Sequence, residues 1–161
     1  MMSIIGEAAT AKVNIPEPSG SYIKFTTDSD GEIIGVKFNL GDAVVLPQYM
    51  FAKRAKLSSI NWPSTITTIG NYAFQDCKGL TIVDIPSNIT ALGTYSFTGC
   101  SNLKTIILRS LTLITWKTNC FPAASSVNNI YVPSSLVESY KAATGWKSYV
   151  DKISSIEGAG L

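Results

Sequence analysis

Leu80–Asn102 reads LTIVDIPSNITALGTYSFTGCSN, and the stretch before it, Leu57–Gly79, reads LSSINWPSTITTIGNYAFQDCKG. Superposed without a gap, the two 23-residue stretches match at positions that include Leu57/Leu80, Ile60/Val83, Pro63/Pro86, Ile66/Ile89, Gly70/Gly93, Phe74/Phe97 and Cys77/Cys100. A fixed period of about 20–30 residues indicates a solenoid, because one such unit cannot bury its apolar side alone. The sequence therefore predicts a stack of similar coils.

The constant positions of the repeat each have a physical reason. Val83 and Ile85 are two residues apart, so they share one face of a strand. Pro86 ends that strand, because proline has no N–H to donate to a ladder. Gly93 suits a sharp turn with unusual dihedral angles. Phe97, and the cysteine three residues after it, are expected to fill the inside of the returning path.

Written out, the pattern is L-x-x-I-x-I-P-x-x-I-x-x-I-G-x-x-A-F-x-x-C-x-x, which resembles the BspA-type leucine-rich repeat family of bacterial surface proteins. The two central repeats carry the motif nearly whole, and it degrades outside them. The resemblance implies a mainly β fold with short helical turns, a leucine-rich-repeat solenoid of about four to five coils. It also implies a non-catalytic module for recognition or adhesion.

Residues 33–56 are predicted to form an atypical first coil. Counting back one period from the first central repeat places Val36, Phe38, Leu46, Tyr49 and Phe51 at motif positions. An atypical repeat is expected next to the end of a solenoid.

The coil after the central repeats departs from the pattern. It begins with a predicted strand at Leu103–Leu108 and has one extra residue before Phe121. It departs from the motif at Arg109, which replaces the proline, and at Lys117, which replaces the glycine. Leu113 and Trp116 fall on the inward sites that Ile89 and Leu92 hold in the preceding repeat. Cys120 falls on the small site of Ala73 and Ser96, and Ala124 falls on the cysteine site. Val127–Val132 is predicted as the last strand.

The solenoid is expected to span residues 33–132 of one structural domain, between an N-terminal β-hairpin cap at 1–32 and a C-terminal helical cap at 133–161. In the first cap, Ala11–Ile15 and Tyr22–Thr26 alternate as strands do, and Asp28–Gly31 is a turn leading into Glu32–Phe38. The two aspartates of that turn lack the further ligands of a calcium loop.

The C-terminal segment carries helix signals. Ser135 and Glu138 have the spacing of a capping box, and Gly145 is a stop signal. A second short helical stretch is predicted over Trp146–Ile153. Trp146 and Tyr149 are the candidates to cover the open apolar end of the last coil, where an unpaired strand edge would otherwise invite aggregation.

Composition excludes several classes of function. The 161 residues include no histidine, which removes histidine bases and histidine metal ligands. The net charge of +2 gives no electrostatic reason to bind nucleic acid or an anionic membrane. No apolar run reaches the length of a membrane span, and the start MMSIIGEAAT does not resemble a secretory signal. We expect no cofactor and no metal.

Cys77 and Cys100 occupy the same repeat position and are expected to lie inside adjacent coils. Buried free thiols are favoured, because core cysteines behave as small hydrophobic residues. A disulfide between the two is the alternative. A cysteine nucleophile would need a base, and the scattered carboxylates show no pattern of a catalytic pair. An enzyme is therefore the least favoured hypothesis.

The outward positions of the strands are the candidate binding face, because solenoids use such stacked columns as extended binding surfaces. Ile82, Ile107 and Tyr131 are apolar or aromatic there, which favours contact with a partner. The candidate residues are Ser59, Asn61, Ile82, Asp84, Thr105, Ile107, Asn129 and Tyr131. Gly35 and Lys37 hold the same positions in the first coil, and Arg109, Trp116 and Lys117 mark the irregular coil.

Two hypotheses of function follow. The first is a recognition or adhesion module that binds a protein or a glycan, including one from a host; the resemblance implies a secreted or cell-surface location. The second is a structural part of a larger assembly such as a phage virion, or a homo-oligomer. It is motivated by the Met1 start without an export signal and by the low charge.

The repeat alignment makes one sharp structural prediction. Phe51, Phe74, Phe97 and Phe121 follow one another at intervals of 23, 23 and 24 residues, one in each coil. They are therefore expected to form a continuous buried aromatic stack.

Overall fold

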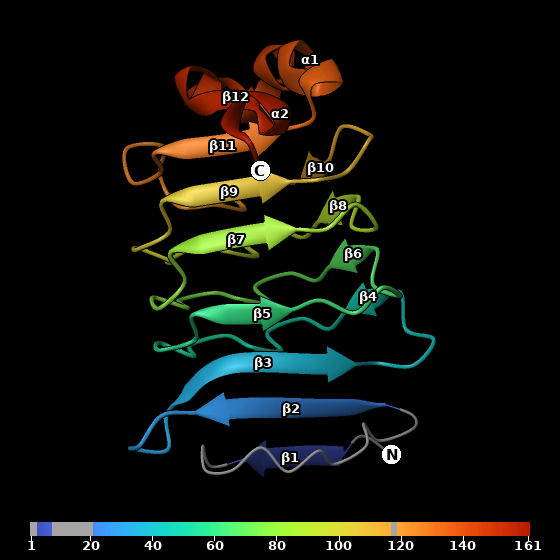
Figure 1. The fold of residues 1–161 in the computed structure, drawn as a ribbon, viewed down its shortest axis with the longest axis vertical. Helices are drawn as coiled ribbons and strands as arrows, with labels where there is room; N and C mark the ends of the chain where they lie inside the picture. The colour runs from blue at the N-terminus through green and yellow to red at the C-terminus, as the bar shows by residue number, and fades with distance from the viewer. Residues whose placement is uncertain (1–2, 8–20, 117–118) are drawn as a thin grey trace.

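The computed structural model describes residues 3–7, 21–116 and 119–161. Strands dominate it, and short helices gather at the C-terminal end (Figure 1). The strands form three four-stranded sheets, two of which run along the stack of coils as parallel ladders. The expected repeat fold is therefore present, whereas the number of coils and the caps stay predictions.

The first parallel ladder is formed by the strands that open successive repeats. Their order is β12 (Ile153–Ser155), β11 (Asn129–Val132), β9 (Thr105–Leu108) and β7 (Ile82–Ile85). Val83 pairs with Ile106, and Ile106 with Ile130, so equivalent positions of the repeat lie side by side. These three residues are buried, while their sequence neighbours point outward.

The second parallel ladder lies where each coil returns. It joins β4 (Val45–Leu46), β6 (Thr68–Ile69), β8 (Ala91–Leu92) and β10 (Thr115–Trp116). The pairing of Leu46 with Ile69 confirms that residues 33–56 hold an atypical repeat in register with the next one. The pairing of Trp116 with Leu92 confirms the alignment of the irregular coil. Leu113, which was expected to point inward before this strand, is only half-buried, and the next residue, Ile114, is buried instead.

The N-terminal sheet combines β1 (Ser3–Glu7), β2 (Tyr22–Thr27), β3 (Ile33–Asn39) and β5 (Ser59–Asn61), in that order. The predicted hairpin is present, because β2 and β3 pair antiparallel across a turn in which the Asp28 carboxylate accepts hydrogen bonds from the N–H groups of Asp30 and Glu32. The strand predicted at Ala11–Ile15 lies outside the described residues. The division into 1–32, 33–132 and 133–161 stays a prediction.

The C-terminal segment differs from the sequence expectation in its details. A 3-10 turn at Ser134–Leu136 leads into α1 (Val137–Ala142), and no side chain caps that helix, so the predicted capping box is wrong. Glu138 instead forms an ion pair with Lys141 one turn later, at 3.3 Å. A 3-10 segment follows at Thr144–Lys152, where a short helical stretch was predicted. It is followed by β12 and α2 (Ile156–Ala159), which were not predicted from the sequence.

The core is organised around the predicted phenylalanine stack. Phe51, Phe74, Phe97 and Phe121 are all buried, and their successive ring centroids lie 5.3, 5.1 and 5.4 Å apart with the rings nearly parallel. These are offset-stacking distances at the spacing of neighbouring strands. The stack continues beyond its four members to Phe38 at one end and Trp146 at the other.

Aromatic residues also secure the C-terminal segment to the last coils. Trp146 and Tyr149 are buried, as expected for residues that cover the end of the stack. The Tyr149 hydroxyl donates a hydrogen bond to the carbonyl of Pro122, and the Tyr140 hydroxyl accepts one from the N–H of Ile114 at 2.9 Å. Burial raises the pKa of Tyr149 to about 12.

The glycine of the repeat serves close approach rather than unusual dihedral angles. A Cβ atom on Gly93 would lie 2.6 Å from the backbone nitrogen of Asn71 in the coil before it. The left-handed conformation falls two residues later, at Tyr72 and Tyr95, with φ of 56° and 59°. These two rings stack on each other, and Tyr72 also stacks on Tyr49, so a second aromatic column runs along the turns.

Phe97→Ala is expected to lower the free energy of unfolding by about 3–5 kcal/mol, because it opens a cavity between two coils. Denaturation in urea, followed by circular dichroism, measures the change. The control is Leu111→Ala at a residue that is 78% exposed, which should shift stability by less than about 0.5 kcal/mol. Equal effects of the two substitutions would contradict the stacked core.

Ser96→Ala is expected to stabilise the protein by about 1 kcal/mol. The Ser96 hydroxyl is fully buried and has no hydrogen-bond partner among the described residues, and the same position of the preceding repeat is Ala73. The same denaturation experiment tests this, with the exposed Ser87→Ala as a control of no effect. A loss of stability on Ser96→Ala would show that the hydroxyl does find a partner.

The thiols are expected to be unreactive in the folded protein. Cys77, Cys100 and Cys120 are buried thiols, and burial raises the pKa of Cys77 to about 11 and that of Cys100 to about 12. In mildly alkaline buffer, a thiol-specific disulfide reagent should therefore react slowly with native protein and release the signal of three thiols once the protein is unfolded in guanidinium chloride. Rapid reaction of the native form would contradict this.

Candidate functional site

The eight predicted surface residues lie on the outer face of the strands, and six of them form two columns. Thr105 of β9 pairs with Ile82 of β7 and with Asn129 of β11. In the second column Ile107 pairs with Asp84 and with Tyr131. Ser59 and Asn61 hold the equivalent positions on β5, but they pair with β3 rather than with β7.

Exposure divides this face into open and covered parts. Ile82 is 55% exposed, and Ser59, Asn61, Asp84 and Asn129 are also exposed. Thr105 and Tyr131 are half-buried. Ile107 is only 6% exposed, so the expectation that its side chain offers contact surface is wrong. Its register partners Asp84 and Tyr131 lie on either side of it in the ladder, at the spacing of about 4.8 Å between paired strands.

The ladder of opening strands is interrupted between β5 and β7. Within the described residues these strands belong to different sheets, although they open consecutive repeats, and Figure 1 shows them farther apart than β7 and β9. The other side of the same two coils is intact, because β6 pairs with β8 and Phe74 stacks on Phe97. The two coils therefore meet along one side and diverge along the other.

Trp62 provides a physical reason for the interruption. It holds the inward position that Ile85 and Leu108 fill in the next two coils, and its indole lies edge-on to Phe38 and Phe74 at 6.3 and 5.5 Å. An indole is much larger than an aliphatic side chain at this position, and a packed core accommodates extra volume by shifting the backbone. The indole thus lies where β5 and β7 separate.

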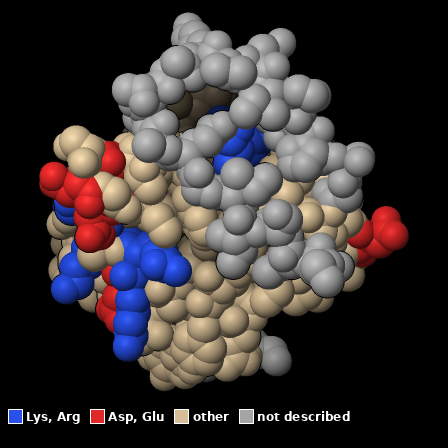
Figure 2. Space-filling view, turned by 90° about the horizontal axis from the view of Figure 1, so that it is seen from below, with Lys and Arg blue, Asp and Glu red and all other residues tan. Residues whose placement is uncertain are grey.

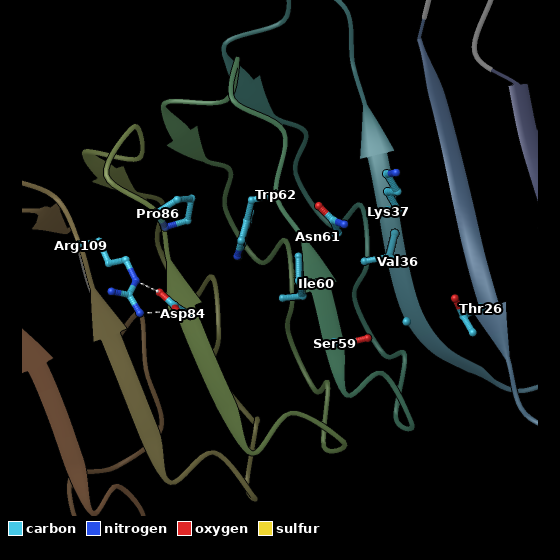
Figure 3. A pocket seen from close by; sticks show the side chains of 11 residues that line it. Thr26, Val36, Lys37, Ser59, Ile60, Asn61, Trp62, Asp84, Pro86 and Arg109 are labelled. Carbon is cyan, nitrogen blue, oxygen red and sulfur yellow. Dashed lines mark hydrogen bonds and ion pairs between the residues drawn. The ribbon is translucent and has the colours of Figure 1, made fainter. Parts of the chain in front are cut away.

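The interruption opens a groove of about 700 Å³ on the strand face. Inward residues that are buried in later coils are accessible here, namely Ile60 and Trp62. Figure 3 shows Trp62 in the space between β5 and Pro86, with the outward side chain of Asn61 beside it. Neither the indole N–H of Trp62 nor the side-chain amide of Asn61 has a hydrogen-bond partner among the described residues.

An ion pair forms the opposite wall of the groove. Arg109 donates two parallel hydrogen bonds to the Asp84 carboxylate, each of 2.8 Å, and the carboxylate raises the pKa of Arg109 (Figure 3). The pair is partly exposed, so its contribution to stability is small, about 0–1 kcal/mol. The backbone N–H of Arg109 also donates to the carbonyl of Ile85 at 2.9 Å, which the proline of the repeat pattern could not do.

The sequence reading missed the groove, Trp62 and the pairing of Arg109 with Asp84. A signal was present in the sequence, because Trp62 is larger than its equivalents Ile85 and Leu108, and Arg109 replaces the proline of the motif. The side chain of Trp116 and all of Lys117, which were named with Arg109, lie outside the described part of the chain.

The described residues include no cluster of three or more side chains able to hold a metal ion. None of their helices combines the length and apolar composition of a membrane span. At the N-terminal end, Lys56 pairs with Asp28 at 3.0 Å, and Figure 2 shows acidic and basic side chains mixed on that flank rather than a surface of one sign.

Comparisons with known proteins identify the family of the repeat. No curated protein matches the chain. A solved structure, a leucine-rich repeat protein from Bacteroides ovatus ATCC 8483, is 25% identical, covers 73% of this chain and superposes with a TM-score of 0.48. The matched part is 35% of that protein's chain. The family described as "BspA type Leucine rich repeat region" matches residues 44–153 with six copies of its repeat, so the chain belongs to the BspA-type leucine-rich repeat family.

Proposed function

We propose that the protein is a non-catalytic recognition module that holds a protein or glycan partner on its strand face. The observation that carries the proposal is the groove between β5 and β7, where exposed polar groups surround an accessible indole. Binding sites combine apolar contact area with a few well-placed polar groups, and Trp and Arg are enriched among the residues that dominate binding energy.

The location of the groove supports this role. Ser59 and Asn61 line it from β5, and Asp84 lines it from β7, so three of the eight predicted surface residues meet there. The remaining exposed positions continue the surface over β9 and β11 without a break in the ladder. Leucine-rich repeat domains generally mediate interactions, and an adhesive role at the cell surface is the finer form of the proposal.

The test is binding to a printed panel of glycans and of purified extracellular-matrix proteins, followed by affinity measurement for each hit. Asn61→Ala and Tyr131→Ala remove contact groups from the strand face and are expected to weaken binding about tenfold each, or about 1.4 kcal/mol. Thr90→Ala, at an exposed residue of the returning side, is the matched control and should leave binding unchanged.

Unchanged affinity in both strand-face variants would show that the partner binds elsewhere on the molecule. Ile107→Ser is unsuitable as a test, because it would place a hydroxyl at a buried position and change stability together with binding. Absence of any hit on the panel would count against recognition of these partner classes. The assembly component suggested by the sequence stays a prediction, which the mass of the protein in solution tests.

A further inference from the structure

The interruption leaves a strand edge unpaired in the interior of the strand face. The carbonyls of Thr81 and Ile85 accept hydrogen bonds from the N–H groups of Thr105 and Arg109 in the following coil, at 3.2 and 2.9 Å. In a parallel ladder, alternate residues turn their backbone groups to opposite neighbours. Ile82 and Asp84 therefore turn their N–H and C=O groups toward β5, where within the described residues no ladder receives them.

β5 cannot satisfy these groups in the present structure. The carbonyl of Ile34 accepts a hydrogen bond from the N–H of Ser58 at 2.8 Å, so Ile34 faces β5, and in the register of Gly35 with Ser59 the backbone groups of Ser59 and Asn61 pair with β3. By alternation, Ile60 between them turns its N–H and C=O groups toward the groove. Two strand edges thus face each other with Trp62 between them. Ile60 of β5 and Asp84 of β7 both line the groove.

The edge of β7 repeats the same groups at a fixed interval. The N–H groups of Ile82 and Asp84 are two residues apart, which is about 6.6 Å along a strand, and each is followed by a carbonyl. An extended polypeptide carries donors and acceptors with this same repeat, and strand addition to an open edge is an established way to bind peptides. A sugar chain has no backbone amide of matching period.

We propose that the groove binds an extended peptide segment of a partner protein, which adds as a strand to the free edge of β7. The inference rests on the proposed recognition function and names the chemistry of the partner. The peptide backbone pairs with Ile82 and Asp84, and one of its side chains enters the groove toward Trp62. The exposed side chain of Ile82 flanks the added strand on the outer face.

Charge gives no strong selection at this edge. Asp84 and Arg109 neutralise each other as an ion pair, so the edge carries no net charge that would demand an acidic or a basic peptide. Backbone pairing and the fit of one side chain against the indole supply the recognition. The peptides that bind are therefore expected to share β-branched and aromatic residues, which favour the extended form, rather than a charge pattern.

The experiment selects binders from a yeast-displayed library of random peptides against the wild-type protein. Selected peptides are then measured against Ile82→Pro and Ile82→Ala. Proline removes the N–H that faces the groove, which has no ladder partner in the folded protein, and a strand edge tolerates proline. Alanine trims the side chain but keeps the backbone donor, so it is the matched control.

The expected result is a loss of about tenfold or more in affinity with Ile82→Pro and a change within about threefold with Ile82→Ala. Thermal unfolding of the variants shows whether both are folded. Independently of the variants, amide hydrogen exchange of the wild-type protein should slow at Ile82 and Asp84 when a selected peptide saturates it.

Two results would overturn the inference. One is equal affinity of the selected peptides for the wild type and a folded Ile82→Pro, with no slowing of exchange at Ile82 and Asp84. The other is failure of the library to yield any binder. If a glycan binds on the panel and no peptide is selected, the proposed recognition function stands and strand addition fails.

Discussion

Stacking of equivalent phenylalanine side chains is the interaction on which the rest of the structure depends. One ring from each of four coils lies 5.1–5.4 Å from the next, close to the spacing of paired strands, so the rings and the backbone ladders impose the same register. A coil that slipped by one residue would lose both at once. The three cysteines complete this arrangement, because their thiols donate to backbone carbonyls of the coil before, as Cys100 does to Phe74 at 3.2 Å.

The same constraint explains why the strand face can differ between coils. The ring stack and the ladder of β4, β6, β8 and β10 keep the coils in register on one side. The strand side is then free to accept a residue of another size, and Trp62 is that residue. Because the returning side stays regularly paired, the strand face can hold a groove without loss of the repeat.

Much of the fold followed from the sequence because it depends on spacing. The intervals between phenylalanines predicted the stack, and counting back by one period found the atypical first coil, whose Leu46 pairs with Ile69. The groove did not follow, because a period of 23 residues is the same whether or not β5 pairs with β7. Alternation assigned Ile107 to the outer face but could not show that its side chain is buried there. The Ser135 capping box failed because the 3-10 turn at Ser134–Leu136 places the start of α1 one residue past the expected spacing.

The joint between the second and third coils has a mechanical consequence. Its two sides are unequal, since β6 and β8 are paired while β5 and β7 are not. A pulling force along the stack would meet no ladder hydrogen bonds between β5 and β7 in the described part of the chain, and the coils would rotate about the Phe74–Phe97 contact as about a hinge. Tension on a tethered molecule would then widen the mouth of the groove before any coil unravelled, so the geometry of the groove would vary with load.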